Sequence, residues 1–459
     1  MVSEGIVTPQ VGTSSRHARV AWLLAPLAVG LGTLGVGAVA LWPFRSLSTD
    51  EAVAVTRARQ PLGDLLHTIV RHEPAQAGFL LILKGAALVG TDERTMRAAS
   101  VIAFALAAAL TVVLGASLLG HVEGVVAGIA LGANAGAVAV ARETAPYALG
   151  LLGVVVATLL LVLALERHRA WRWALYGVAC IALPLTHPLA ASVLIAHAAA
   201  LATHREWRSS RVGIGIAAAG MALAALLVAW AAADRLDAPD GTGGFDLADI
   251  GHGLLGAAGW SPVLVAAALA GLYALVAGKP MVMPVWRTAL VAGLVAAPFV
   301  VAVLAAAALP VFPDPALVAC APGLALAAGA AFRLLPAPRA RWAAVAALLA
   351  VSAVAVGIVI AAKPDEDWRA VAAAVHRVRG PRESVVVLPD RSRAAFAYYA
   401  PYTRTSLYAR GDGAWVAVAA DDPASAIAVA RRAVRTPRYA LLRQFRYGDG
   451  LRLQHWVRP

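Results

Sequence analysis

The sequence is poor in cysteine and in charge. Its 459 residues include two cysteines, Cys180 and Cys320, and each lies inside a long apolar run. Cysteines in such runs pack as small apolar side chains, so a disulfide framework is not expected. Charged residues make up 14% of the chain, compared with about 25% in soluble domains. This low charge excludes an ordinary soluble protein.

The sequence also lacks the motifs of nucleotide and zinc enzymes. The run Gly241-Thr242-Gly243-Gly244 lies among aspartates in a polar stretch and is typical of a flexible or capping segment, so nucleotide binding is not expected. No His-Glu-x-x-His spacing is present. A divalent cation remains an open possibility, because suitable ligand types follow the first apolar run and recur later. These candidate ligands are Asp50, Glu51, His72, Glu73 and His187.

What the chain has in abundance is apolar sequence. Hydrophobic residues make up 60% of it and the mean hydropathy is +0.73, which indicates a polytopic membrane protein. Apolar stretches able to cross a hydrocarbon core of about 30 Å recur along the chain. We predict eleven spans: 20–42, 97–118, 122–140, 147–165, 172–185, 188–204, 211–233, 260–278, 287–308, 316–335 and 342–362.

The basic residues set the orientation of these spans. With eleven spans, the short basic loops all fall on the side of the N-terminus, which is therefore cytoplasmic. The apolar stretch 75–90 is short and carries Lys84, so we interpret it as a helix in the outer interface. With the N-terminus inside and eleven spans, the remaining polar segments fall outside: 45–96, 141–147, 186–187, 234–259 and the C-terminal tail.

The tail from Lys363 is predicted to be a small extracytoplasmic α/β domain. It holds 17 Lys and Arg against 9 Asp and Glu, and long domains cross membranes largely regardless of charge. We therefore divide the chain into a helical membrane domain, 1–362, and a soluble domain, 363–459. The tail's pattern predicts a helix ending at Val378, a strand 384–388, a helix 391–399, a helix 423–434 and a strand 439–445.

Two adjacent carboxylates, Asp50 and Glu51, follow the first span directly. A carboxylate at the membrane boundary can accept a proton from a hydroxyl group, and partial burial raises its pKa towards the working range. Asp50 is our candidate base. The alternative is that the pair only caps an interfacial helix after Ser48 and Thr49.

A second polar site follows the third span. Arg142 is suited to binding a phosphate, with Glu143 beside it, and Tyr147 is suited to stacking on a sugar. The alternative is an interfacial ion pair with an anchoring aromatic residue. His187, in a short break between apolar runs, would lie at the same depth, although a lone histidine there can equally be structural.

In order along the chain, several motifs resemble one known family. They are Ser-Thr-Asp-Glu-Ala at 48–52, His-Glu-Pro at 72–74, Gly-Thr-Asp-Glu at 90–93, Arg-Ala-Ala-Ser at 97–100, Ala-Arg-Glu-Thr-Ala-Pro-Tyr at 141–147, Thr186-His187 and Asp-Trp-Arg at 367–369. The chain resembles the polyprenyl-phosphate-dependent glycosyltransferases of the GT-C superfamily. The resemblance is to glycosyltransferase family 39 and the actinobacterial mannosyltransferase-like branch.

The resemblance implies a plasma-membrane enzyme that moves a sugar from a polyprenyl-phosphate carrier to a hydroxyl of an envelope glycan, lipid or protein, with inversion. Mannose or arabinose is favoured, because the composition indicates a GC-rich genome. Asp50 would be the base, and Glu51 would hold the acceptor or a cation. His72 and Glu73 would line the acceptor side. Arg142 would bind the carrier phosphate, helped by Lys84 and Arg97.

Two other classes of function remain open at this stage. Eleven spans also suit a transporter or flippase of a lipid-linked envelope precursor, although such proteins place ionisable groups near the bilayer midplane. The polar groups here gather on one face instead. The third class is a non-catalytic envelope assembly protein in which the acidic pair is structural.

Overall fold

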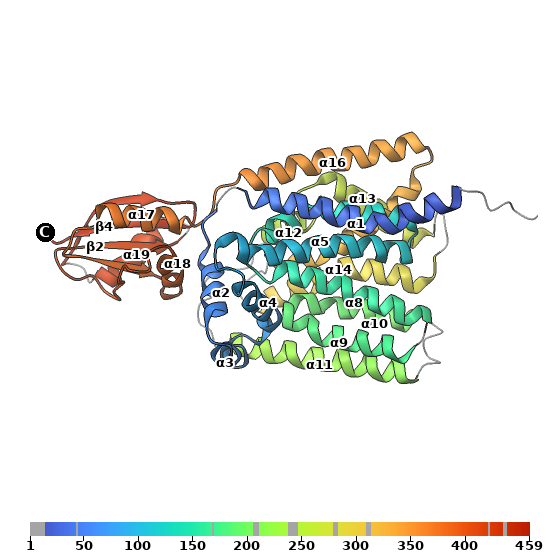
Figure 1. Ribbon diagram of the computed structural model, residues 1–459, viewed down its shortest axis with the longest axis horizontal. Helices are drawn as coiled ribbons and strands as arrows, with labels where there is room; N and C mark the ends of the chain where they lie inside the picture. The colour runs from blue at the N-terminus through green and yellow to red at the C-terminus, as the bar shows by residue number, and fades with distance from the viewer. Residues whose placement is uncertain are drawn as a thin grey trace, which may run out of the picture.

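A bundle of long helices carries a small α/β unit at one end (Figure 1). The computed structural model describes residues 14–42, 45–167, 169–204, 211–236, 247–278, 283–308, 314–420, 423–434 and 438–459. Within the predicted polar segment 234–259, residues 237–246, which include the Gly241–Gly244 run, lie outside the described residues. Residues Leu247–Ala257 of that segment form helix α12.

Helices occupy each of the eleven predicted spans. The bundle consists of α1 (Ser14–Ala40), α5 (Glu93–Leu118), α6 (His121–Gly132), α7 (Ala135–Ala141), α8 (Tyr147–Arg167), α9 (Ala170–Thr186), η2 (Pro188–Ser192), α10 (Val193–Thr203), α11 (Arg211–Leu236), α12, α13 (Pro262–Ala277), α14 (Val285–Ala308), η4 (Asp314–Cys320), α15 (Ala321–Ala331), η5 (Phe332–Leu334) and α16 (Pro338–Ala361).

By length and composition, fewer of these helices qualify as single membrane spans. Among the described residues, seven are long and apolar enough to cross, or up to nine if the bent pairs α6–α7 and α12–α13 each count as one span. The other two predicted spans are shorter helices: α9 has 17 residues, and η2 with α10 forms an apolar stretch. The fold is therefore the predicted polytopic helical one, with several spans broken or short.

Close contact between backbones holds part of the bundle together. A Cβ atom built on Gly115 of α5 would lie 2.6 Å from the Cα atom of Gly124 in α6, so a side chain at either position would push the two helices apart. Small residues that let helices approach in this way are typical of membrane helix packing. They fix α5, which carries Arg97 in its first turns.

The segment between α1 and α5 folds into short helices beside the bundle. They are α2 (Thr49–Arg59), α3 (Leu62–His72), η1 (Pro74–Gln76) and α4 (Ala77–Ala87). With 11 residues, α4 is about 16 Å long, too short to cross a bilayer core. Helix α3 is amphipathic: it buries Leu65 and Ile69 and exposes Leu62, Leu66 and Val70.

The C-terminal unit is a four-stranded sheet with helices, which is the predicted α/β class. It contains α17 (Trp368–Val378), β1 (Glu383–Leu388), η6 (Asp390–Ser392), α18 (Arg393–Tyr399), β2 (Gly413–Ala419), α19 (Pro423–Val434), β3 (Ala440–Arg446) and β4 (Leu451–Val457). The strand order is β1-β2-β4-β3, with β1 parallel to β2 and the other pairs antiparallel. The sequence prediction missed β2 and β4.

One hydrophobic cluster joins the C-terminal unit to the short helices. It contains Leu47 and Val55 from the α2 region together with Trp368 and Phe396 from α17 and α18, all fully buried. Helix α2 packs on α4 on one side and on α18 on the other. This shared core fixes the position of the acidic pair between the bundle and the C-terminal unit.

Candidate active site

The acidic pair lies in the first turn of α2. Ser48 is the N-cap, and its Oγ accepts a hydrogen bond from Glu51 N (3.3 Å), while Glu51 Oε2 accepts one from Ser48 N (3.0 Å). This capping box satisfies two otherwise free backbone donors, and negative charge is favoured at a helix N-terminus. The alternative that the acidic pair caps a helix is therefore correct for Glu51.

Glu51 makes a two-point ion pair with Arg97 of α5. Arg97 Nε donates to Glu51 Oε1 (2.8 Å) and Nη2 donates to Oε2 (2.7 Å), and both residues are buried. Thr144 N also donates to Oε1 (2.7 Å). Burial raises the pKa of the Glu51 carboxyl, but Arg97 and the backbone N–H groups of Thr144 and Ser48 lower it more, so it lies below its usual range. Glu51 is thus held ionised.

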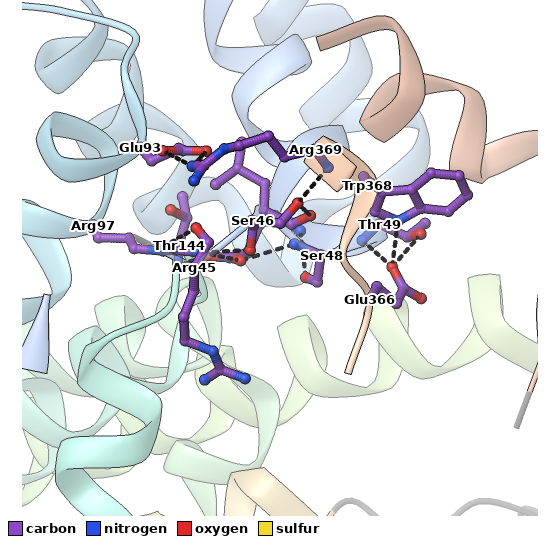
Figure 2. A network of polar contacts seen from close by, with 12 residues as sticks. Arg45, Ser46, Ser48, Thr49, Glu93, Arg97, Thr144, Glu366, Trp368 and Arg369 are labelled. Atoms are coloured by element: carbon purple, nitrogen blue, oxygen red, sulfur yellow. Dashed lines mark hydrogen bonds and ion pairs between the residues drawn. The ribbon is translucent and has the colours of Figure 1, made fainter. Parts of the chain in front are cut away.

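Arg97 also fixes the chain that leads into α2. Its Nη1 donates to Arg45 O (3.0 Å) and its Nη2 donates to Ser46 O (3.1 Å). Figure 2 shows Arg97 reaching this segment, with Thr144 close by and the Arg45 side chain extending away from the network. One guanidinium group therefore holds the segment 45–51 against α5 at several points.

Arg142 lies buried between α7 and α8, with 2% of its surface exposed. Its Nη1 donates to Val359 O of α16, whereas Nε and Nη2 have no hydrogen-bond partner among the described residues. Burial, followed by the charges of Arg45 and Arg97, lowers the pKa of Arg142 to about 10. Two unpaired, buried N–H groups form a fork suited to an anion.

Glu143 follows in the same loop and is partly buried. Burial and then the negative charge of Glu51 raise its pKa to about 7, against the opposing charges of Arg45 and Arg97. A carboxyl group with this pKa exists in both protonation states near neutral pH, which is typical of functional sites. The sequence singled out Glu143 but did not indicate this property.

Asp50 points elsewhere. It is exposed and lines a pocket with residues of the C-terminal unit and of its own helix start: Ser48, Thr49, Glu366, Arg391, Ser392 and Ala419. Within the described part of the chain, neither Asp50 nor Arg391 has a hydrogen-bond or ion-pair partner. Arg142 and His187 do not line this pocket. Asp50 therefore faces the C-terminal unit, whereas Glu51 faces Arg97 of α5.

The other predicted residues fall into two groups. Tyr147 and His187 lie together, with ring centroids 5.2 Å apart, and His187 Nδ1 accepts a hydrogen bond from Leu189 N. In the segment 45–96, Glu73 pairs with Arg57, and Lys84 donates to Gln60 O. His72 is exposed at the end of α3.

The candidate cation ligands do not assemble into a metal site. Among the described residues, no group of three or more His, Cys, Asp or Glu side chains is placed to hold a metal ion. Glu51 is occupied by Arg97, and Glu73 by Arg57. The sequence missed Arg45 and Arg391, because isolated arginines in loops carry no local pattern.

Comparisons with known proteins agree with this architecture. Residues 74–231 match the family model described as dolichyl-phosphate-mannose-protein mannosyltransferase. The crystal structure of ArnT from Cupriavidus metallidurans in the apo state matches with a TM-score of 0.59 at 13% identity, covering 95% of this chain and 98% of that one. The chain therefore has a GT-C-like fold, and about a third of it matches a GT-C family model.

A second structure, ArnT from the same organism bound to undecaprenyl phosphate, matches the chain with a TM-score of 0.54 at 12% identity, covering 97% of this chain and 98% of that one. No curated protein sequence matches the chain. The match to the family model includes Lys84, Arg97, Arg142 and Glu143 and begins after the acidic pair. The predicted resemblance is confirmed for the superfamily and for the fold.

Proposed function

We propose that this GT-C protein transfers a sugar from a polyprenyl-phosphate carrier to an acceptor hydroxyl, with inversion at the anomeric carbon. The observation that carries the proposal is the buried loop 142–143. There, Arg142 keeps two N–H groups unpaired next to Glu143, a carboxyl group with a pKa of about 7. The fold supports it, because a structure with the same fold holds undecaprenyl phosphate.

The donor phosphate would bind at Arg142. The free Nε and Nη2 groups can donate to two phosphate oxygens, and the positive charges of Arg45 and Arg97 add attraction. An ionised Glu143 would repel the phosphate, whereas its protonated form can donate a hydrogen bond to it. Tyr147 and His187 would line the sugar, and Lys84 would assist nearby on the outer segment.

In the reaction, the acceptor oxygen attacks the anomeric carbon from the face opposite the phosphate. The bond between that carbon and the phosphate oxygen breaks, and polyprenyl phosphate leaves with the electron pair. Asp50, the free carboxylate, would accept the hydroxyl proton, which requires the donor sugar to extend from the phosphate at Arg142 to the start of α2. Glu51 would act as a positioning residue through Arg97, and His72 and Glu73 would lie on the acceptor side.

We place the reaction at the outer leaflet of the plasma membrane. The short basic loops fall on one side in the eleven-span topology, which puts the N-terminus in the cytoplasm and the C-terminal unit outside. Mannose or arabinose on a polyprenyl carrier is the donor that we favour, and an envelope glycan, lipid or protein supplies the hydroxyl.

The test is donor turnover by purified protein in proteoliposomes, with mannosyl- and arabinosyl-phosphopolyprenol as donors. Wild-type protein should release polyprenyl phosphate in step with glycoside formation. Asp50→Asn should lower kcat by about 10²-fold or more, as expected when a general base is lost. Arg382→Ala is the matched control, because Arg382 is an exposed arginine outside the site. Wild-type rates in Asp50→Asn would remove Asp50 as the base.

A further inference from the structure

The pocket beside Asp50 has one wall from α2 and one from the C-terminal unit. Ser48, Thr49 and Asp50 come from the start of α2, whereas Glu366, Arg391, Ser392 and Ala419 come from the C-terminal unit. The two walls are tied together, since Thr49 N and Oγ1 donate to Glu366 Oε2 (2.7 Å each) and Thr49 Oγ1 accepts from Ser392 Oγ (3.1 Å). Figure 2 shows Glu366 meeting Thr49 and Trp368.

The free groups of this pocket are complementary to a polyol. Asp50 offers acceptor oxygens only, Arg391 offers donors only, and neither has a partner among the residues described. The rest of the lining is the Glu366 carboxylate, which already accepts hydrogen bonds from Thr49 and Trp368, the hydroxyl groups of Ser48, Thr49 and Ser392, and one apolar side chain, Ala419. Neighbouring sugar hydroxyls both donate and accept, so a carbohydrate can satisfy both charged groups at once.

Further contacts hold the C-terminal unit against the bundle. Trp368 is fully buried, and its Nε1 donates to Glu366 Oε2 (2.7 Å). Arg369 contacts both oxygens of Glu93 at the start of α5, and Tyr398 OH donates to Thr91 O (2.8 Å). The unit is therefore held against the bundle by polar contacts on both sides of the pocket.

We propose that this pocket binds the acceptor and that the acceptor is a sugar residue of a glycan. In this arrangement Arg391 holds hydroxyls of the acceptor sugar while Asp50 receives the proton of the hydroxyl that reacts. The inference rests on the proposed function and adds the acceptor class and the part played by the C-terminal unit. Arg391 is then a substrate-binding residue supplied by that unit.

The test uses full-length protein in proteoliposomes, a phosphopolyprenol-linked sugar as donor and octyl mannoside as the acceptor probe. Arg391→Ala should raise the acceptor KM about tenfold, as expected for losing a charged hydrogen bond, and should leave the donor KM unchanged. Arg391→Lys should restore part of the loss. Ala419→Leu, which fills the pocket without removing charge, should also raise the acceptor KM. Arg382→Ala should change neither constant.

The other possible results distinguish a failure of this inference from a failure of the proposed function. Equal acceptor KM values in wild type, Arg391→Ala and Ala419→Leu, with donor cleavage intact, would overturn this inference and leave the proposed function standing. Transfer to a serine- and threonine-containing peptide or to dodecanol, but not to octyl mannoside, would replace the glycan by another acceptor class. Failure of wild-type protein to cleave any donor would contradict the proposed function and this inference with it.

Discussion

Glu51 and Arg97 form a buried ion pair with two parallel hydrogen bonds, Nε to Oε1 at 2.8 Å and Nη2 to Oε2 at 2.7 Å. The pair joins α2 to α5, and Thr144 brings the loop of Arg142 to the same carboxylate. The geometry of the site therefore depends on a contact between residues 46 positions apart in the sequence.

Removing one member of this pair should be strongly destabilising. Arg97→Ala leaves the buried Glu51 carboxyl group without its main partner, so we expect a loss of about 3–5 kcal/mol in the free energy of unfolding. Unfolding in detergent measures this, with Arg382→Ala as the control. A stability within error of wild type would show that the pair does not hold the site together.

The same pair predicts an acid limit to stability. The pKa of Glu51 is lower in the folded protein than its usual value of 4.5, so its stabilising contribution is present above 4.5 and is lost as the pH falls through the folded pKa. Unfolding temperatures measured between pH 6 and pH 3 should fall for wild type. Glu51→Gln should start less stable and show a smaller fall, and parallel curves would contradict this assignment.

Glu143 should control donor binding through its protonation. Because its pKa is about 7, it carries a negative charge above that pH, which opposes the donor phosphate. We expect the donor KM of wild type to rise about tenfold per pH unit above pH 7, and that of Glu143→Gln to stay flat. Its stability effect has the opposite sign to that of Glu51: as the pH rises from 4.5 to about 7, the raised pKa predicts falling stability.

The topology can be read from cysteine labelling. Both native cysteines are buried, so an introduced cysteine would be the main reactive thiol. Tyr402→Cys, at a fully exposed position of the C-terminal unit, should react with a membrane-impermeant maleimide in intact cells. Arg339→Cys, at an exposed position in the first turn of α16, should react only after the cells are opened. The reverse pattern would invert the proposed orientation.

The sequence predicted the elements whose signals are local. Apolar runs located helices at all eleven predicted spans. The apolar stretch 75–90 was predicted to be too short to cross the membrane, and α4 within it is indeed a short helix. Strand β2 was not predicted because it is apolar throughout and almost entirely buried, so its sequence does not alternate. A continuous apolar run of that kind carries no period that marks a strand.

The sequence identified several residues of the candidate site but did not predict what each of them contacts. Asp50 and Glu51 are neighbours in sequence, yet successive helix positions point about 100° apart, so one faces the pocket and the other faces Arg97. The contributions of Arg391 and Glu366 depend on how the C-terminal unit docks. No local pattern encodes such a long-range contact.

The most direct measurement follows both products of one turnover. Purified wild-type protein in sealed vesicles would receive a donor labelled in the sugar and in the lipid, together with octyl mannoside. The account predicts one polyprenyl phosphate released for each glycoside formed, with the anomeric configuration inverted and with both products lost in Asp50→Asn. Movement of intact donor across the vesicle membrane without cleavage of the sugar–phosphate bond would contradict it and indicate a transporter.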